Sequence, residues 1–134
     1  MKFIHLLLGG LIGLFISAFA GAADVTIAVV GKTKNDSFYQ QSFAGCQAFA
    51  REHAELKCIY DGPKDYQDIR GQVDAVNSVI KQGIDGLLIS TTDSDFLVAQ
   101  VLKQLKAQDI PVITYDSDLL PKHSAYRLTY VGTN

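Results

Sequence analysis

The sequence has little cysteine and histidine and no excess of basic charge. Its 134 residues include two cysteines and three histidines, and 12 basic against 14 acidic residues give a formal net charge of −2. This mild acidity argues against nucleic acid or an anionic membrane surface as a partner. No histidine or carboxylate stands at ligand spacing beside either cysteine, which argues against a metal centre there.

Several catalytic motifs are missing as well. No predicted strand is followed by G-x-G-x-x-G or G-x-x-x-x-G-K-[ST], so no phosphate-binding loop of known type is present. There is no G-x-S-x-G nucleophile elbow. His5 lies in the apolar N-terminus, His53 at a helix end and His123 in a polar loop, so none is placed as an obvious catalytic base. We expect a protein that is not an enzyme and has no cofactor.

The N-terminus has the features of a signal peptide. Lys2 precedes the largely apolar stretch 3–19, and small residues at 18–22 offer two small-x-small cleavage sites. The stretch is short for a bilayer span and lacks a basic stop-transfer cluster, which argues against an uncleaved anchor. No cysteine lies near the cleavage site, which argues against a lipoprotein. We expect residues 1–23 to be removed and the mature protein to be exported and then soluble.

Apolar β-branched runs alternate with helical periodicity along the rest of the chain. Strands are predicted at 25–30, 56–60, 85–90, 111–115 and 126–131. Helices are predicted from about 37 to 53, over 69–80, and from Asp93 or Ser94 to about 108. The connections are long enough for parallel crossovers. The sequence therefore predicts an α/β fold with a doubly wound, mostly parallel sheet.

Two of these helices have clear inward faces in the sequence pattern. The residues expected to face the sheet are, in the first helix, Phe43, Cys46, Phe49 and Ala50, and in the third, Leu97, Val98, Val101, Leu102 and Leu105. The last predicted strand has no helix after it, although a parallel sheet needs both faces covered. We therefore expect 24–134 to be one lobe of a protein whose second lobe is absent from this sequence.

The two cysteines fall on neighbouring elements. Cys46 lies late on the first predicted helix and Cys58 on the strand that follows. Export places them in an oxidising compartment, where an even count favours a disulfide. The alternative is two buried free thiols, because cysteine packs well as a small apolar residue.

Polar and aromatic residues follow the predicted strands at their carboxyl ends, where ligands of open parallel sheets bind. These residues are Lys32, Asn35, Asp36, Ser37, Phe38 and Tyr39 after the first strand, Asp61 after the second, 90–94 after the third, and Asp116, Ser117 and Asp118 after the fourth. A carboxylate accepts hydroxyl groups, and an aromatic ring covers the apolar face of a polyol. Asp116 with Phe38 and Tyr39 would meet both needs.

Other interpretations of the same residues stay open. Phe38 could instead close the start of the first helix, and Asp93 or Ser94 could cap the third. The carboxylates Asp36, Asp93, Asp116 and Asp118 could form a hydrolytic or Mg²⁺ site, although secretion and the neighbouring aromatic residues count against this.

Four segments resemble the periplasmic sugar-binding proteins of the ribose/galactose type, the substrate-capturing subunits of ABC importers. The segments are Lys32-x-x-Asn35-Asp36-Ser37-Phe38-Tyr39, the run 83–90 (GIDGLLIS), the run 110–118 (IPVITYDSD) and the run 130–134 (YVGTN). The resemblance covers about 24–134. It implies two similar lobes joined by hinge strands, with the ligand in the cleft between them, and this chain is similar to the N-terminal lobe.

The resemblance also implies roles for individual residues. It implies that Phe38 or Tyr39 supplies an aromatic contact, that Asn35 or Asp36 supplies a polar one, and that Asp116 holds sugar hydroxyls. Lys32, Ser117 and Asp118 complete the expected ligand-binding set. The family often has Asn-Pro at 36–37 and Arg at 117, where this chain has Asp-Ser and Ser, so the sugar is left open. A subset of such proteins shares a pair like Cys46 and Cys58, which favours the bridge.

The sequence therefore predicts a periplasmic solute-binding protein that captures a monosaccharide or related polyol for an ABC importer. Ligand contacts on both lobes would stabilise a closed form that a membrane permease recognises. One alternative is a sensor of the same fold that presents its ligand to a chemoreceptor or histidine kinase. Another is a small secreted metal-dependent α/β hydrolase. A repressor of the lac type is rejected because such proteins begin with a helix-turn-helix and have no signal peptide.

Overall fold

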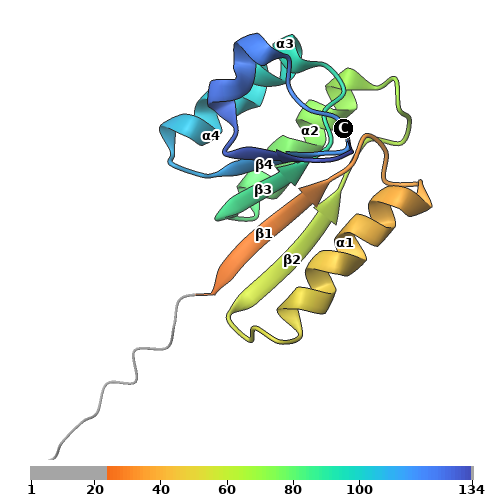
Figure 1. The fold of residues 1–134 in the computed structure, drawn as a ribbon, viewed down its shortest axis with the longest axis vertical. Coiled ribbons are helices and arrows are strands. Elements are labelled where there is room, and N and C mark those ends of the chain that lie inside the picture. Colours follow the sequence, from red (N-terminus) through yellow and green to blue (C-terminus); the bar gives the residue numbers. More distant parts are fainter. Residues whose placement is uncertain (1–23, 134) are drawn as a thin grey trace, which may run out of the picture.

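The computed structural model describes residues 24–133, so the predicted signal peptide 1–23 and the last residue, Asn134, lie outside the described residues. The described residues form a single α/β lobe (Figure 1). None of the helices in this part of the chain is both long enough and apolar enough to cross a membrane.

Five parallel strands form one sheet in the order β2-β1-β3-β4-β5. The strands are β1 (Val25–Val30), β2 (Leu56–Asp61), β3 (Gly86–Ile89), β4 (Val112–Tyr115) and β5 (Thr129–Val131). The predicted doubly wound parallel sheet is confirmed. The chain first steps from β1 to β2 and then crosses back to β3, so the order reverses between β1 and β3. Ligands of such sheets bind beyond the carboxyl ends of the strands near this reversal.

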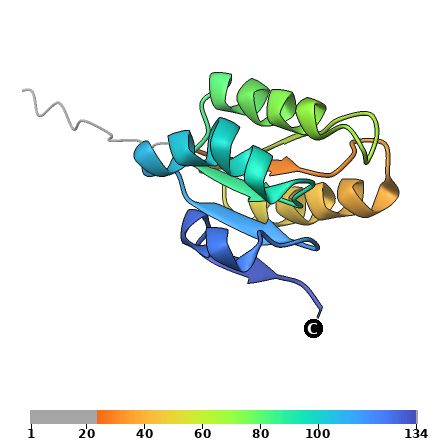
Figure 2. The ribbon, with the colours of Figure 1, turned by 90° about the horizontal axis from the view of Figure 1, so that it is seen from above.

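Helices cover both faces of the sheet (Figure 2). On one face α1 (Ser37–Ala50) packs against β1 and β2, and on the other lies α2 (Ile69–Lys81). The third predicted helix shares the face of α2 and has three parts: α3 (Ser94–Leu97), the π-helical turn η1 (Val98–Leu102) and α4 (Lys103–Ala107). Its bounds agree with the prediction to within a residue, but the π turn in its middle was not predicted.

The main core lies between the sheet and the helices α2, α3 and α4. From the strands it takes Ala28, Val30, Leu87, Ile89 and Val112, and from the helices it takes Val76, Val79, Leu97, Val101, Leu102 and Leu105. All five inward residues predicted for the third helix are at most 3% exposed. The face of α1 is different, because Tyr39 is its one buried residue.

The prediction that Phe49 faces the sheet is wrong. Its side chain is 57% exposed and stacks on His53 at a centroid distance of 4.0 Å. Phe43 does pack inward, against Tyr60 of β2 at 5.2 Å. Because α1 packs mainly against the edge strand β2, its buried stripe is narrower than the sequence pattern indicated. The helix also ends at Ala50, before the predicted end at 53.

The segment before β5 forms a short 3-10 helix, η2 (Pro121–Tyr126), which the sequence did not predict. Tyr126 belongs to this helix and packs against the core, so the last strand begins at Thr129 rather than at 126. Leu128 N donates to Val112 O at 2.8 Å and starts the pairing of β5 with β4.

A disulfide joins Cys46 of α1 to Cys58 of β2, with 6.1 Å between their Cα atoms. This separation lies within the usual range for the bond. The register of β2 against β1 places Cys58 on the same face as Tyr60, which packs under α1. The bridge therefore ties the helix to the edge strand that it covers.

Candidate functional site

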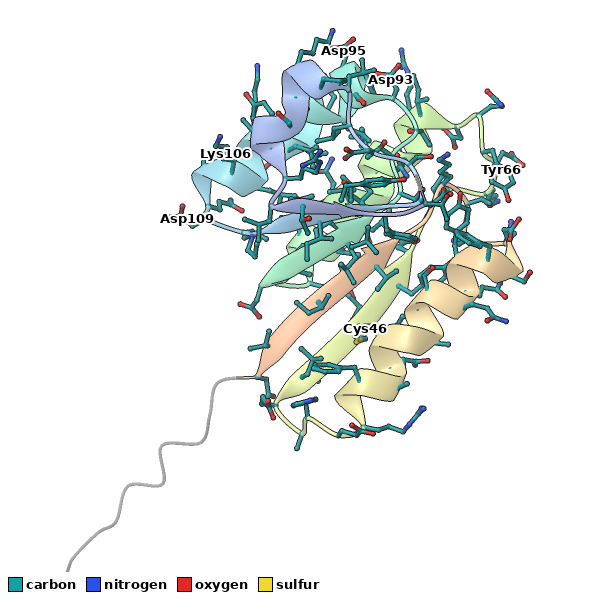
Figure 3. The ribbon with its side chains drawn as sticks, viewed as in Figure 1. Cys46, Tyr66, Asp93, Asp95, Lys106 and Asp109 are labelled. Atoms are coloured by element: carbon teal, nitrogen blue, oxygen red, sulfur yellow. A yellow bond between two sulfur atoms is a disulfide. The ribbon has the colours of Figure 1, made fainter. Side chains whose placement is uncertain are left out.

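The carboxyl ends of β1, β3 and β4 bring most of the predicted residues to one rim of the sheet. Asp116 follows β4 and stands between the loop after β1 and the loop after β3. Figure 3 shows Tyr66 at this end of the molecule, beside the start of α1, and Asp109 at the opposite end of the sheet. The candidate ligand-binding residues therefore lie together at this rim of the sheet.

Asp116 has an unusual backbone conformation, with a φ of 59° in the left-handed region. Aspartate and asparagine tolerate this region better than other residues that carry a side chain, at a cost of about 1–2 kcal/mol. The conformation is held by β5, because Asp116 N donates to Val131 O at 3.1 Å and Asp116 O accepts from the Tyr130 hydroxyl at 2.8 Å. The turn aims the carboxylate across the rim.

One oxygen of this carboxylate is fully engaged. Asp116 Oδ2 accepts from Ser90 Oγ at 2.7 Å and from the Tyr39 hydroxyl at 3.1 Å, and Lys32 Nζ lies 3.7 Å away. Within 24–133 no residue donates a hydrogen bond to Oδ1, and the side chain remains 33% exposed. The contacts therefore fix the carboxylate through Oδ2 and leave Oδ1 without a donor from the described residues.

Tyr39 lies beneath the carboxylate and is only 4% exposed. Its burial raises the pKa of the phenol to about 12, so the hydroxyl stays protonated and donates at neutral pH. The end of β1 passes very close to this ring. A Cβ atom added at Gly31 would lie 2.7 Å from Tyr39 Cβ, which explains why a glycine follows the strand.

Two exposed aromatic rings flank Tyr39. Phe38 is 53% exposed and meets the Tyr39 ring edge-to-face at 5.2 Å, and Tyr66 is 47% exposed with its centroid at 6.1 Å. Tyr66 comes from the loop after β2 and was missed by the sequence analysis, which considered only Asp61 there. Its position after a strand of the same sheet was the signal that could have found it.

Asn35 and Asp36 hold the loops of the rim together. Asn35 Nδ2 donates to Lys64 O at 3.1 Å. Asp36 caps α1 by accepting from Phe38 N at 2.7 Å, and it also accepts from the Tyr66 hydroxyl. The bond from Tyr66, and then the bond from Phe38 N, holds the pKa of Asp36 below its ordinary value. A ligand contact of either residue stays a prediction.

Asp118 forms a two-point ion pair with Arg127. Arg127 Nε and Nη2 each donate to one of its oxygens at 2.6 Å, and Thr114 Oγ1 and Leu119 N donate at 2.5 and 2.8 Å. The Arg127 guanidinium is the main cause that holds the pKa of Asp118 below its ordinary value. This geometry favours a structural role for Asp118 over the predicted ligand contact.

Ser117 is part of the same turn, where its carbonyl accepts from Thr91 N at 3.1 Å. Lys32, Ser117 and Asp118 line an open pocket of about 330 Å³ beside the loop after β3. Asn35 and Asp36 line a smaller one of about 200 Å³ with Tyr66. These five predicted residues are therefore divided between two open depressions, while Phe38 lines a third beside the start of α1.

The cap interpretation of Asp93 is confirmed, because its Oδ1 accepts from Phe96 N at 2.7 Å at the start of α3. The four aspartates of the metal alternative do not come together. In the described part of the chain no three histidine, cysteine or acidic side chains form a group that could hold a metal ion.

Comparisons with known proteins agree with the geometry. Residues 27–134 match the family described as periplasmic binding protein domain. The D-ribose/D-allose-binding protein of Pseudomonas aeruginosa is 34% identical over 97 residues, which are 72% of this chain and 30% of that protein. The ribose import binding protein of Bacillus subtilis is 29% identical over 93 residues, or 69% of this chain and 29% of that protein.

A solved structure gives the same picture. The chain is similar to an ABC transporter solute-binding protein from Agrobacterium vitis that was solved with bound D-fucose. The match covers 81% of this chain and 37% of the Agrobacterium protein, with a TM-score of 0.74 and 29% sequence identity. The resemblance read from the sequence is confirmed. The chain spans about 30% of the curated relatives that it matches.

Proposed function

Because the chain belongs to the periplasmic binding protein domain family, we propose that the complete protein captures a monosaccharide or related polyol for an ABC importer. Two of the named relatives are called ribose- or allose-binding proteins and the third holds D-fucose, and the family's description as a periplasmic binding protein domain supports a periplasmic location. Residues 1–23 would serve as the signal peptide for export, and 24–134 as the N-terminal lobe.

The observation that carries the proposal is the arrangement at Asp116. Its Oδ2 is engaged by three groups of the protein, while Oδ1 faces the rim without a donor from 24–133. A charged oxygen held in place in this way accepts a ligand hydroxyl strongly, because the bond is charge-assisted and little further ordering is needed. The exposed rings of Phe38 and Tyr66 would cover the C–H face of a sugar ring.

The rim is open, so a ligand resting on it would stay partly solvated. We propose that a second lobe closes over it, as the short length of this chain against its relatives suggests. Contacts on both lobes would stabilise the closed form. A membrane permease would then recognise the closed, loaded protein.

Isothermal titration calorimetry on the complete protein tests this function. D-ribose, D-allose and D-fucose form the first panel, with divalent cations removed by a chelator. We expect at least one sugar to bind with a dissociation constant in the micromolar range or below, and the chelator to have no effect. Failure of every monosaccharide and polyol to bind would refute the proposal.

A further inference from the structure

A glutamine that took no part in the predicted site lies buried beneath the rim. Gln72 is in the first turn of α2, and its side chain is 0% exposed. Burying a polar amide costs free energy unless its hydrogen bonds are satisfied. Its partners therefore show what the side chain holds in place.

The Gln72 amide makes four hydrogen bonds to three residues, one in the loop after β1 and two in the loop after β3. Nε2 donates to Gly31 O at 3.0 Å and to Ser90 O at 2.7 Å. Oε1 accepts from Thr92 N at 2.9 Å and from Thr92 Oγ1 at 2.7 Å. An amide has two N–H donors and two acceptor lone pairs, so this one is saturated. Its orientation is also fixed, because a flipped amide would set its oxygen against two carbonyls.

The two carbonyl groups that accept from Gln72 Nε2 belong to residues that contact Asp116, in one case through its own side chain and in the other through Tyr39. Ser90, whose carbonyl is bound by Gln72, donates its hydroxyl to Asp116 Oδ2. Gly31 packs against the ring of Tyr39, whose hydroxyl donates to the same oxygen. One buried side chain therefore bridges the ends of β1 and β3, beside the main-chain bond from Ser90 N to Val30 O at 3.1 Å, and so supports the two hydroxyl donors of the carboxylate.

We infer that Gln72 is a positioning residue for Asp116 and, resting on the proposed function, that sugar affinity depends on it. Gln72 acts through Ser90 and Gly31 and does not touch the ligand. Without its amide, the two hydroxyl donors shift, the carboxylate is no longer held by Oδ2, and Oδ1 loses its fixed direction toward the ligand.

The first test needs no sugar. The side-chain ¹³Cγ resonance of Asp116 is measured by NMR in the wild type, in Gln72→Met and in Ser90→Ala. Val79→Ala is the matched control, because Val79 is also 0% exposed and on α2 but lies in the apolar core, about two helical turns beyond Gln72. We expect Gln72→Met to move the resonance in the same direction as Ser90→Ala, and Val79→Ala to leave it unchanged.

A resonance in Gln72→Met that stays at the wild-type position would overturn the inference, as would an equal shift in Val79→Ala. If Gln72→Met does not fold, the same resonance of Asp116 is measured in Gln72→Asn instead. It keeps an amide in the site but is one methylene too short to span all four partners, so it should show the same shift.

The second test measures sugar affinity. We expect Gln72→Met to weaken binding at least about tenfold, and to add little further loss in an Asp116→Asn background. Equal losses in both backgrounds would mean that Gln72 acts elsewhere and would overturn the inference. A wild type that binds no sugar, together with the expected shift of the Asp116 resonance, would refute the proposed function and support the positioning role.

Discussion

Replacing Asp116 by asparagine tests the ligand contact with the least change to the fold. Asparagine has the same shape and tolerates the observed φ of 59° about as well as aspartate. The Lys32 ammonium, 3.7 Å from Oδ2, can only donate, so the amide oxygen takes the Oδ2 position. The amide nitrogen then replaces Oδ1, and an acceptor for the ligand becomes a donor.

The expected loss is large in binding and small in stability. Removing one partner of a buried charged hydrogen bond costs about 2–5 kcal/mol of binding free energy, so the dissociation constant should rise by about 30-fold to several thousand-fold. Asp116→Ala should weaken binding by a similar amount. It also leaves the hydroxyl of Ser90, which is 0% exposed, without its acceptor, and should therefore lower the melting temperature as well.

Calorimetry with the best sugar of the panel gives the affinities, and thermal unfolding gives the stabilities. Asp74→Asn is the control, because Asp74 is an exposed aspartate on α2 and the substitution makes the same change of charge. An Asp116→Asn protein that binds within threefold of the wild type would refute the assignment of Oδ1 as the ligand acceptor.

Three further predictions concern other parts of the lobe. Removing the disulfide with Cys46→Ala and Cys58→Ala should lower the free energy of unfolding by about 3 kcal/mol, because the bridge closes a loop of 12 residues and restricts the unfolded chain. Urea titration measures this difference, and a change below about 1 kcal/mol would contradict the prediction. Arg127 holds the pKa of Asp118 in the folded protein below its ordinary value of 3.8. The ion pair therefore adds to the free energy of unfolding above pH 3.8, and this stabilisation is lost as the pH falls through the pKa of Asp118 in the folded protein. The stability gap between wild type and Asp118→Asn should therefore narrow below about pH 4 in acid titrations, and a gap that is constant from pH 3 to 7 would count against the pair. Tyr66→Ala should weaken sugar binding by about 1 kcal/mol while Tyr66→Phe retains it in calorimetry, and equal losses would show that the hydroxyl, not the ring, matters.

Elements with strong local patterns could be predicted closely from the sequence. β1 was predicted to the residue because its β-branched apolar run is bounded by Asp24 on one side and Gly31 on the other. The inward face of the third helix was also correct, since several apolar residues repeat at helical spacing. The π turn in the same helix left no signal, because one wider turn changes the spacing too little to disturb that pattern.

The site was predicted less completely because its geometry depends on contacts between distant segments. Asp116 could be found from its place after a buried strand. The pairing of Asp118 with Arg127 and the four bonds of Gln72 could not, since each depends on how loops from different strands meet. Phe49 was predicted wrongly for a related reason, because an apolar stripe does not show how much of a sheet the helix covers.

Under the proposed function, the position of Asp116 between segments that are remote in sequence would make the lifetime of the protein depend on the supply of its ligand. The Tyr39 hydroxyl reaches it across 77 positions of sequence, and β5 holds its backbone from the other side. An unfolded or half-folded chain therefore has no such acceptor, and sugar would bind the native state alone. At a sugar concentration of 100 times the dissociation constant, mass action adds about 2.7 kcal/mol to the free energy of unfolding. Proteases that attack unfolded chains would then remove empty molecules faster than loaded ones.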